Sequence, residues 1–413
     1  MKLPSFHSIF FIFFILPLSP SFSGTPPDSS LLKKAEKLHD KIISIDSHND
    51  TPLRMMQPGF DIGVRHDPYQ DRSKVDLVRM KEGRLDGAFF AVFVSQGKRD
   101  PESYRKVTEK AMTIFDTIDA AVGRHPAQAG LAFSAADAER LKKMDRRAVY
   151  IGIENGYAIG KDLSLIETFY RRGARYITLC HTKNNDICDS STDTIEHDGL
   201  SAFGKQVVRE MNRLGMMIDV SHISDQSFYD VLAVSKAPVI ASHSCARAIC
   251  NNPRNLDDAM LGALAAHGGV VQMCILSDYV KTPDPNPKRD SARAALRAKY
   301  NGFEGLSEEE MKKARKEWYA IDDLFPPKLA SVSDVVDHID HMVRVAGIDH
   351  VGIGTDFDGG GAVNGCFDVS GMKNITVELL RRGYTASDIR NIWGGNLLRV
   401  MKEVEQIAEK RHE

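Results

Sequence analysis

Residues 42–50 have the sequence IISIDSHND, a short β-branched run that ends in a His-x-Asp pair. Two later stretches share this design, because residues 218–222 (IDVSH) and 239–243 (VIASH) are apolar runs that also end in a histidine. Side chains alternate along a strand, so His48 and Asp50 should face the same side. Several strands that each present a metal-binding side chain at their C-terminal end predict an active site at the top of a barrel of parallel strands.

Strand-like and helix-like segments alternate along the rest of the chain. We expect eight strands, at residues 42–46, 87–94, 148–153, 176–180, 217–220, 239–242, 270–273 and 350–354. Helical segments are expected at residues 31–41, 105–124, 163–172, 203–214, 227–235, 257–267 and 332–346. This alternation favours a single (β/α)8 TIM-type barrel over a doubly wound sheet.

One long connection interrupts the alternation. Residues 282–326, after the seventh strand, are rich in proline, lysine, arginine and glutamate, and we expect an inserted helical segment there. Ser307 and Glu310 have the spacing of a capping box, which predicts a helix over residues 307–318. An insertion after a barrel strand lies at the catalytic face, which suits a lid or a substrate wall. A solvated excursion without a functional role is the alternative.

The composition is that of an ordinary globular enzyme. The chain has 413 residues, of which 42% are apolar and 27% charged, and a net charge of -2. Such a charge gives no electrostatic reason to expect nucleic acid as a partner. The six cysteines show no zinc-finger spacing and do not form a dense disulfide scaffold. Cys180 and Cys274 lie in apolar runs and are expected to be buried thiols.

The N-terminus resembles a secretory signal peptide. Lys2 precedes an apolar run over residues 9–18, and residues 21–24 (SFSG) offer a small-x-small cleavage site. We therefore expect a signal peptide at residues 1–23, a single enzyme domain at residues 24–413, and export to the periplasm or the outside of the cell. An uncleaved anchor is the alternative. No other segment is apolar enough to span a membrane.

Five residues at the predicted strand ends have the chemistry of zinc ligands. These are His48, Asp50, Glu154, His222 and His243. A charged Glu154 at the end of a buried strand must be paired or metal-bound, with a salt bridge as the alternative. Either His222 or His243 alone would more simply be a buried core histidine. Together the five predict two metal ions, one held by His48, Asp50 and Glu154 and one by Glu154, His222 and His243.

Three further polar residues follow predicted strands. His181 and Asp356 come directly after strand-like runs, and glycines at 359–361 follow Asp356. Arg254 lies on the loop after the strand that carries His243. A guanidinium suits bidentate capture of a substrate carboxylate, although an unpartnered surface arginine is the alternative.

Taken together, these segments closely resemble the membrane dipeptidase (renal dipeptidase) family, dizinc peptidases of the amidohydrolase-like barrel group. The matching blocks run in order from residue 42 to about residue 398, namely residues 45–52, 152–156, 175–181, 218–222, 242–244, 252–255 and 352–359. The resemblance suggests a bacterial, exported member. The long insertion, the charged C-terminus without a lipid-anchor signal and the cysteine positions depart from the mammalian members.

The resemblance implies a role for each candidate residue. The five ligands would hold two zinc ions per chain, with Glu154 bridging. His181 would steady the oxyanion, Arg254 would anchor the dipeptide's C-terminal carboxylate, and Asp356 would carry the proton from the attacking water to the leaving amine. Tyr279 falls near a substrate-contacting tyrosine of the family, in a segment that matches poorly. A homodimer is also implied by the resemblance alone.

The expected activity is hydrolysis of the single peptide bond of dipeptides by a hydroxide that bridges two metals, with broad specificity that includes a D-residue at the C-terminal position. A deacetylase or lactonase on the same dizinc scaffold is the alternative enzyme, and a catalytically silent exported binding protein is the alternative of another class.

Overall fold

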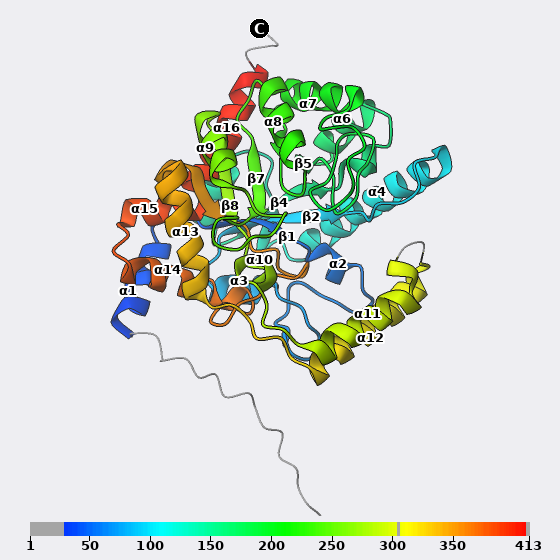
Figure 1. Ribbon diagram of the computed structural model, residues 1–413. Coiled ribbons are helices and arrows are strands. Elements are labelled where there is room, and N and C mark those ends of the chain that lie inside the picture. Colours follow the sequence, from blue (N-terminus) through cyan, green and yellow to red (C-terminus); the bar gives the residue numbers. More distant parts are fainter. Residues whose placement is uncertain (1–28, 304–305, 410–413) are drawn as a thin grey trace, which may run out of the picture.

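Eight parallel strands form the predicted barrel in the computed structural model, which describes residues 29–303 and 306–409 (Figure 1). The expected signal peptide lies outside the described residues. The strands follow one another around the barrel in the order β1 (Ile45–Asn49), β2 (Gly87–Phe93), β4 (Arg147–Glu154), β5 (Ala174–Thr178), β6 (Met217–Asp219), β7 (Ile240–Ser244), β8 (Val270–Met273) and β9 (Val351–Ile353).

The end of β1 meets the segment after β9 and brings the two ends of the sheet together. The N–H of Asp356 donates to the carbonyl of His48 at 3.0 Å, and the N–H of Asp50 donates to the carbonyl of Phe357 at 2.7 Å. The (β/α)8 prediction is thereby confirmed, and residues from opposite ends of the chain become neighbours at the C-terminal end of the barrel.

Two details of the strands differ from the prediction. β3 (Ala129–Leu131) was not expected, and it pairs with β4 outside the main strand order. β1 begins three residues later than expected, so His48 lies inside the strand rather than after it. Ser47, His48 and Asn49 are polar but fully buried in the barrel, so an apolar pattern did not mark them as strand residues.

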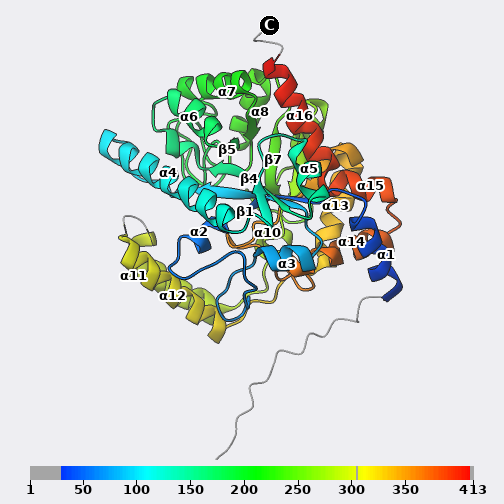
Figure 2. The same ribbon diagram turned by 180° about the vertical axis from the view of Figure 1, so that it is seen from behind.

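Helices surround the barrel (Figure 2). Those predicted are present as α1 (Ser29–His39), α4 (Pro101–Arg124), α6 (Ser164–Arg171), α7 (Ala202–Leu214), α8 (Asp225–Val234), α9 (Asp258–Ala266) and α13 (Val332–Ala346). The structure adds α2 (Pro52–Met55), α3 (Leu77–Glu82), α5 (Asp137–Lys143), α10 (Ser277–Val280), α14 (Lys373–Arg381), α15 (Ala386–Arg390) and α16 (Asn396–Glu409). Local signals fix their ends. In α7, the Ser201 side chain accepts from the Gly204 N–H, and Gly215 ends the helix at a left-handed φ of 76°.

Aromatic side chains fill the barrel interior beneath the C-terminal end. The ring of Phe89 stacks on those of Tyr150 and Tyr176, with centroids 4.7 and 5.4 Å apart. Gly152 makes room for this stack, because a Cβ there would lie 2.0 Å from the Tyr176 ring. Barrel interiors of this kind are packed cores, so the functional side chains must gather above it.

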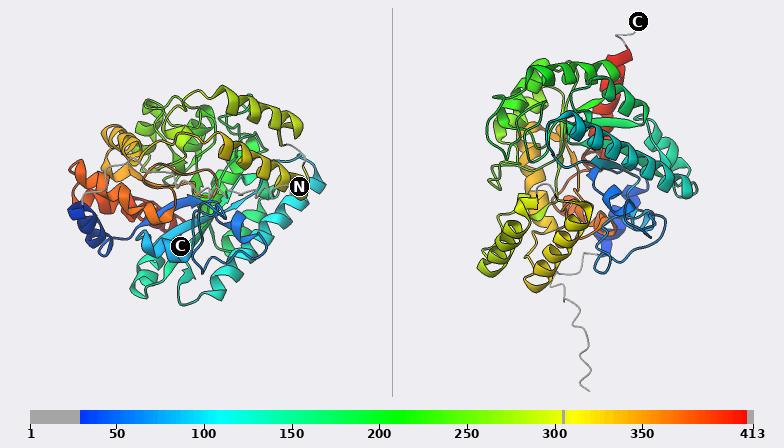
Figure 3. Two further views of the ribbon diagram at one scale, coloured as in Figure 1. Left: turned by 90° about the horizontal axis from the view of Figure 1, so that it is seen from below. Right: turned by 90° about the vertical axis from the view of Figure 1, so that its right-hand side faces the viewer.

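The insertion is a pair of helices rather than the single helix predicted. α11 (Pro287–Lys299) and α12 (Glu308–Leu324) lie side by side as an arm at one end of the barrel (Figure 3). Trp318 of α12 lies against the guanidinium groups of Arg293 and Arg297, and Arg293 pairs with Asp322 at 2.6 Å. The predicted capping box of Ser307 and Glu310 is present and begins α12.

The described part of the chain contains neither a disulfide nor a helix suited to span a membrane. All six cysteines are buried and none forms a disulfide, as expected for Cys180 and Cys274. Within residues 29–303 and 306–409, no helix combines the length and the apolar character that crossing a bilayer requires.

Candidate metal centre and catalytic cavity

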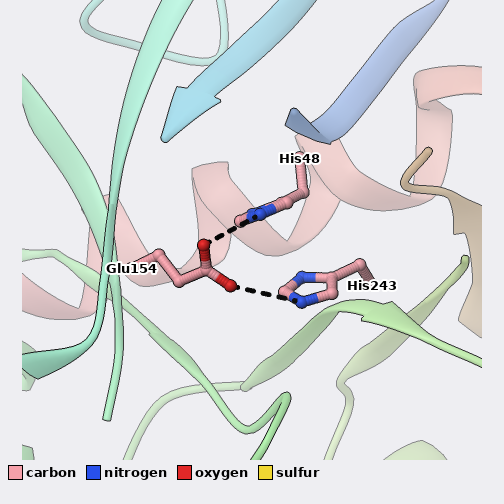
Figure 4. A group of neighbouring side chains, drawn as sticks. All are labelled: His48, Glu154 and His243. Atoms are coloured by element: carbon pink, nitrogen blue, oxygen red, sulfur yellow. Dashed lines mark ion pairs between the residues drawn. The ribbon is translucent and has the colours of Figure 1, made fainter. Parts of the chain in front are cut away.

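The five predicted metal ligands converge on Glu154, the last residue of β4. Its Oε2 lies 3.5 Å from His48 Nε2, and its Oε1 lies 3.1 Å from His222 Nε2 and 3.6 Å from His243 Nε2. Figure 4 shows the carboxylate between the imidazoles of His48 and His243, with one oxygen directed to each. Asp50 Oδ2 completes the group at 3.8 Å from His48 Nε2.

The cluster has the properties of a site for divalent cations. All five residues are buried, with His222 the most exposed at 5%. His48 Nε2 and Asp50 Oδ1 are buried without a hydrogen-bond partner. Burial lowers the pKa values of His222 and His243 well below the usual range, so both rings are neutral and offer lone pairs. Orphaned acceptors of nitrogen and oxygen, gathered away from water, fit zinc or a similar metal.

Hydrogen-bond directions fix which nitrogen of His243 carries the proton. Ser242 Oγ donates to the Asp219 carboxylate at 2.6 Å, because a carboxylate only accepts. The same Oγ lies 2.8 Å from His243 Nδ1, and its hydrogen is already used, so it accepts from an Nδ1–H. The lone pair of His243 is therefore on Nε2, the atom that faces Glu154.

His48 is held in the same way by Tyr176. The Tyr176 hydroxyl donates to the carbonyl of Ser47 at 3.2 Å and lies 2.8 Å from His48 Nδ1. It consequently accepts from the Nδ1–H and leaves the Nε2 lone pair directed at the cluster. Partners of this kind orient metal-binding histidines and fix their tautomers.

Asp356 stands beside the cluster on the segment that closes the barrel. His48, Asp50 and Asp356 place one potential ligand atom each within 4.8 Å of one another. Asp356 has a φ of 58°, in the left-handed region that residues other than glycine adopt uncommonly. Burial, together with the nearby carboxylates of Asp50 and Glu154, raises the pKa of Asp356 well above its usual value.

Gly359 lies directly over these carboxylates. A Cβ there would lie 2.1 Å from Asp50 Oδ2 and 2.2 Å from Asp356 Oδ1. Only glycine therefore leaves both acids in place, which explains a glycine at this position of the turn.

The other predicted site residues, His181, Arg254 and Tyr279, lie around the cluster. His181 Nε2 lies 3.8 Å from Glu154 Oε1, and burial lowers the pKa of this histidine to about 3. Arg254 is only 3% exposed, donates from Nη2 to the carbonyl of His243 at 3.1 Å, and has an unpartnered Nε. Its guanidinium lies 5.3 Å from the centre of the Tyr279 ring, so the poorly matching segment nevertheless places Tyr279 at the site.

A cavity of about 340 Å³ opens onto this group. Asp50, Glu154, His181, His222, Tyr279 and Asp356 all line it. Among the lining residues that sequence reasoning missed are Arg315 and Tyr319, which come from the inserted α12. The insertion is therefore a wall of the cavity and not only a solvated excursion.

A cluster of buried nitrogen and oxygen ligands at the C-terminal end of a parallel barrel defines a metal-dependent barrel enzyme. A model of the membrane dipeptidase family (peptidase family M19) matches residues 32–413. The chain therefore belongs to this family of metallopeptidases and is a peptide hydrolase.

Individual relatives agree with this assignment. Dipeptidase tcpJ of Claviceps purpurea is 32% identical over 372 residues, which cover 88% of this chain and 77% of that protein. Dipeptidase 3 of Mus musculus is 32% identical over 394 residues, covering 93% and 69%. The crystal structure of the probable dipeptidase PvdM from Pseudomonas aeruginosa has a TM-score of 0.80 and 33% identity, covering 92% of this chain and 99% of that one.

Proposed function

We propose that this protein hydrolyses the peptide bond of dipeptides with two zinc ions bound at the Glu154 cluster. The observation that carries the proposal is the convergence of His48, Asp50, Glu154, His222 and His243 on one buried centre that opens into a small cavity. Glu154 has both oxygens directed at imidazole nitrogens, which supports a bridging role. When bound, the metal ions would supply Lewis acidity that activates water and polarises the scissile carbonyl.

Asp356 moves the proton in this proposal. Its raised pKa suits a carboxyl that takes a proton from the attacking water and gives it to the leaving amine. Its place beside Asp50 keeps it within reach of a water held at the cluster.

His181 stabilises the charge that develops on the carbonyl oxygen. Thr182 Oγ1 lies 3.3 Å from His181 Nδ1, and the proposal requires that this hydroxyl donates, so that the proton of the neutral ring is on Nε2. That nitrogen faces the cavity near Glu154, where an N–H can donate to an oxyanion.

Arg254 selects the length of the substrate. Its buried guanidinium retains an Nε–H without an acceptor, and a ligand carboxylate would satisfy it. A tripeptide would place its carboxylate beyond this group, so dipeptides are preferred. We extend the proposal to dipeptides with a D-residue at the C-terminal position, to export through residues 1–23, and to a homodimer.

The test is an assay of purified protein on a panel of L,L- and L,D-dipeptides, tripeptides, an N-acetyl amino acid and a lactone. Dipeptides should be hydrolysed fastest, and removal of metal by a chelator should abolish turnover until zinc is restored. Activity that survives complete metal removal would exclude the mechanism. Asp356→Asn should retain zinc and lose turnover, and full activity in that variant would remove Asp356 from its role.

A further inference from the structure

The inserted helix α12 supplies one wall of the catalytic cavity. Arg315 and Tyr319 are four residues apart, so they share one face of the helix. Both line the cavity together with Leu53 and Arg54, which belong to α2. This wall is the part of the cavity that the hydrolytic chemistry does not use.

Tyr319 offers a hydrogen-bond donor to this wall. Arg54 Nη2 donates to the Tyr319 hydroxyl oxygen at 3.3 Å. The hydrogen of the Tyr319 hydroxyl has no acceptor within residues 29–303 and 306–409. The ring itself is fixed, because the Arg72 guanidinium lies 4.5 Å from its centre.

Arg315 offers a charge that nothing nearby neutralises. It is exposed, and no carboxylate in the described part of the chain pairs with it. The acids further along α12 are taken by other cations, since Glu317 pairs with Lys299, Asp322 with Arg293 and Asp323 with Arg72. Arg54 differs from Arg315, because its charge is offset by Asp358 at 3.2 Å.

The two sides of the cavity thus differ in charge and in hydrogen-bonding groups. Asp50, Glu154 and Asp356 present carboxylate oxygens on one side, whereas Arg315 presents a positive charge and Tyr319 a hydroxyl hydrogen on the other. A group that satisfies the second side is an anion with several acceptor atoms. Arginine and a hydroxyl together suit a carboxylate.

The lining of the cavity connects Arg254 to this wall. If Arg254, after β7, holds the C-terminal carboxylate, the cavity continues from it past Tyr279, after β8, and Asp356, after β9, to Arg54, after β1. The scissile bond then lies near Asp356, after β9, and the amino-terminal residue lies near α2, after β1. The arm of α11 and α12 stands on this side, because Tyr319 contacts Arg54 and Asp323 pairs with Arg72 (Figure 3).

We propose that Arg315 and Tyr319 form a specificity subsite for a side-chain carboxylate on the amino-terminal residue of the dipeptide. The proposal rests on the dipeptidase function above and adds a substrate class to it. The insertion would thereby turn a broadly specific peptidase into one that favours acidic amino-terminal residues.

The experiment compares kcat/KM for isosteric pairs of dipeptides. Wild-type enzyme should favour Glu-Ala over Gln-Ala by roughly tenfold, the usual worth of a charge-assisted hydrogen bond. The pair Ala-Glu and Ala-Gln, with the charge at the other end, should show no such preference. Arg315→Gln should reduce the Glu-Ala to Gln-Ala ratio to near one, and Tyr319→Phe should reduce it partly.

Lys316→Gln is the matched control, because Lys316 is an exposed cation on the same helix that does not line the cavity. It should leave the ratio at the wild-type value. A wild-type ratio near one, or an unchanged ratio in Arg315→Gln, overturns the subsite. Ala-Ala separates the two proposals: an enzyme that hydrolyses Ala-Ala without an acidic preference refutes the subsite alone, whereas one that hydrolyses no dipeptide refutes the proposed function.

Discussion

Ser242→Ala should weaken metal binding although Ser242 is not itself a ligand. The serine hydroxyl connects Asp219 to His243 Nδ1 through distances of 2.6 and 2.8 Å. Without it, the Nδ1–H of a fully buried ring has no acceptor. Leaving a buried donor unsatisfied costs about 1–3 kcal/mol. The ring can avoid this cost by moving its proton to Nε2, but that blocks the lone pair that faces Glu154.

Both outcomes reduce affinity for the metal. A cost of this size corresponds to a loss of roughly 10- to 100-fold, which is the range seen when the partner of a metal-binding histidine is removed. The loss should appear in the apparent Kd for zinc, measured by competition with a chromogenic chelator at fixed pH. Ser242→Thr keeps a hydroxyl on the same atom and should restore most of the affinity.

Ser244→Ala provides the control on the same strand. Its Oγ is also buried, but it has no hydrogen-bond partner, so its removal breaks no bond to a ligand. Zinc affinity should stay at the wild-type value in this variant. If Ser242→Ala binds zinc within twofold of wild type, or if Ser244→Ala loses as much, the assignment of the proton to Nδ1 is wrong.

Three further outcomes follow from the structure. Tyr176→Phe removes the acceptor of His48 Nδ1 and should lower zinc affinity about tenfold in the same competition assay. Gly359→Ala should cut kcat more than tenfold with little change in the melting temperature, because the new Cβ displaces the tips of Asp50 and Asp356 rather than backbone; a fully active variant would contradict this. Burial lowers the pKa of His39 to about 4 from an unfolded value of 6.5, so the unfolded state binds more protons in this window. His39 alone should therefore contribute a fall of about 3 kcal/mol in the free energy of unfolding as the pH drops from 6.5 to 4, so chemical denaturation of metal-free His39→Gln should show a shallower pH dependence than wild type by that amount.

The barrel could be predicted because its strands are short apolar runs with abrupt polar ends. The elements that were not predicted, β3 and α11, lack this pattern. β3 has the sequence Ala-Gly-Leu, which lacks the β-branched residues that indicate a strand. α11 begins at Pro287 in a segment whose polar composition suggested an irregular connection, and hydropathy alone does not reveal two helices that pack on each other.

The convergence of the candidate ligands could be predicted, but the residues that orient them could not. Glu154 was singled out because a charge at the end of a buried strand needs a partner, and the same argument applies to Asp219 in residues 218–222. Asp219 accepts from the N–H of Ser221, two residues along the chain, and from the hydroxyl groups of Ser242 on β7 and Thr178 on β5. No spacing rule connects Asp219 with these two hydroxyl groups, because the barrel alone makes them neighbours.

The histidines of the cluster are oriented by different means, and the difference explains the strained backbone. His48 and His243 are aimed by hydroxyl groups on Nδ1, whereas His222 Nδ1 is buried without a partner. His222 instead has a φ of 71°, and its carbonyl accepts from the Ser191 N–H at 2.8 Å. The Ser191 contact holds the backbone of His222 in this conformation, and the ring in turn contacts the cluster through Nε2, 2.8 Å from His243 Nε2 and 3.1 Å from Glu154 Oε1. His222 lies beyond the end of β6, so a loop contact supports its backbone, whereas His243 lies within β7 and is supported by its neighbours in the sheet.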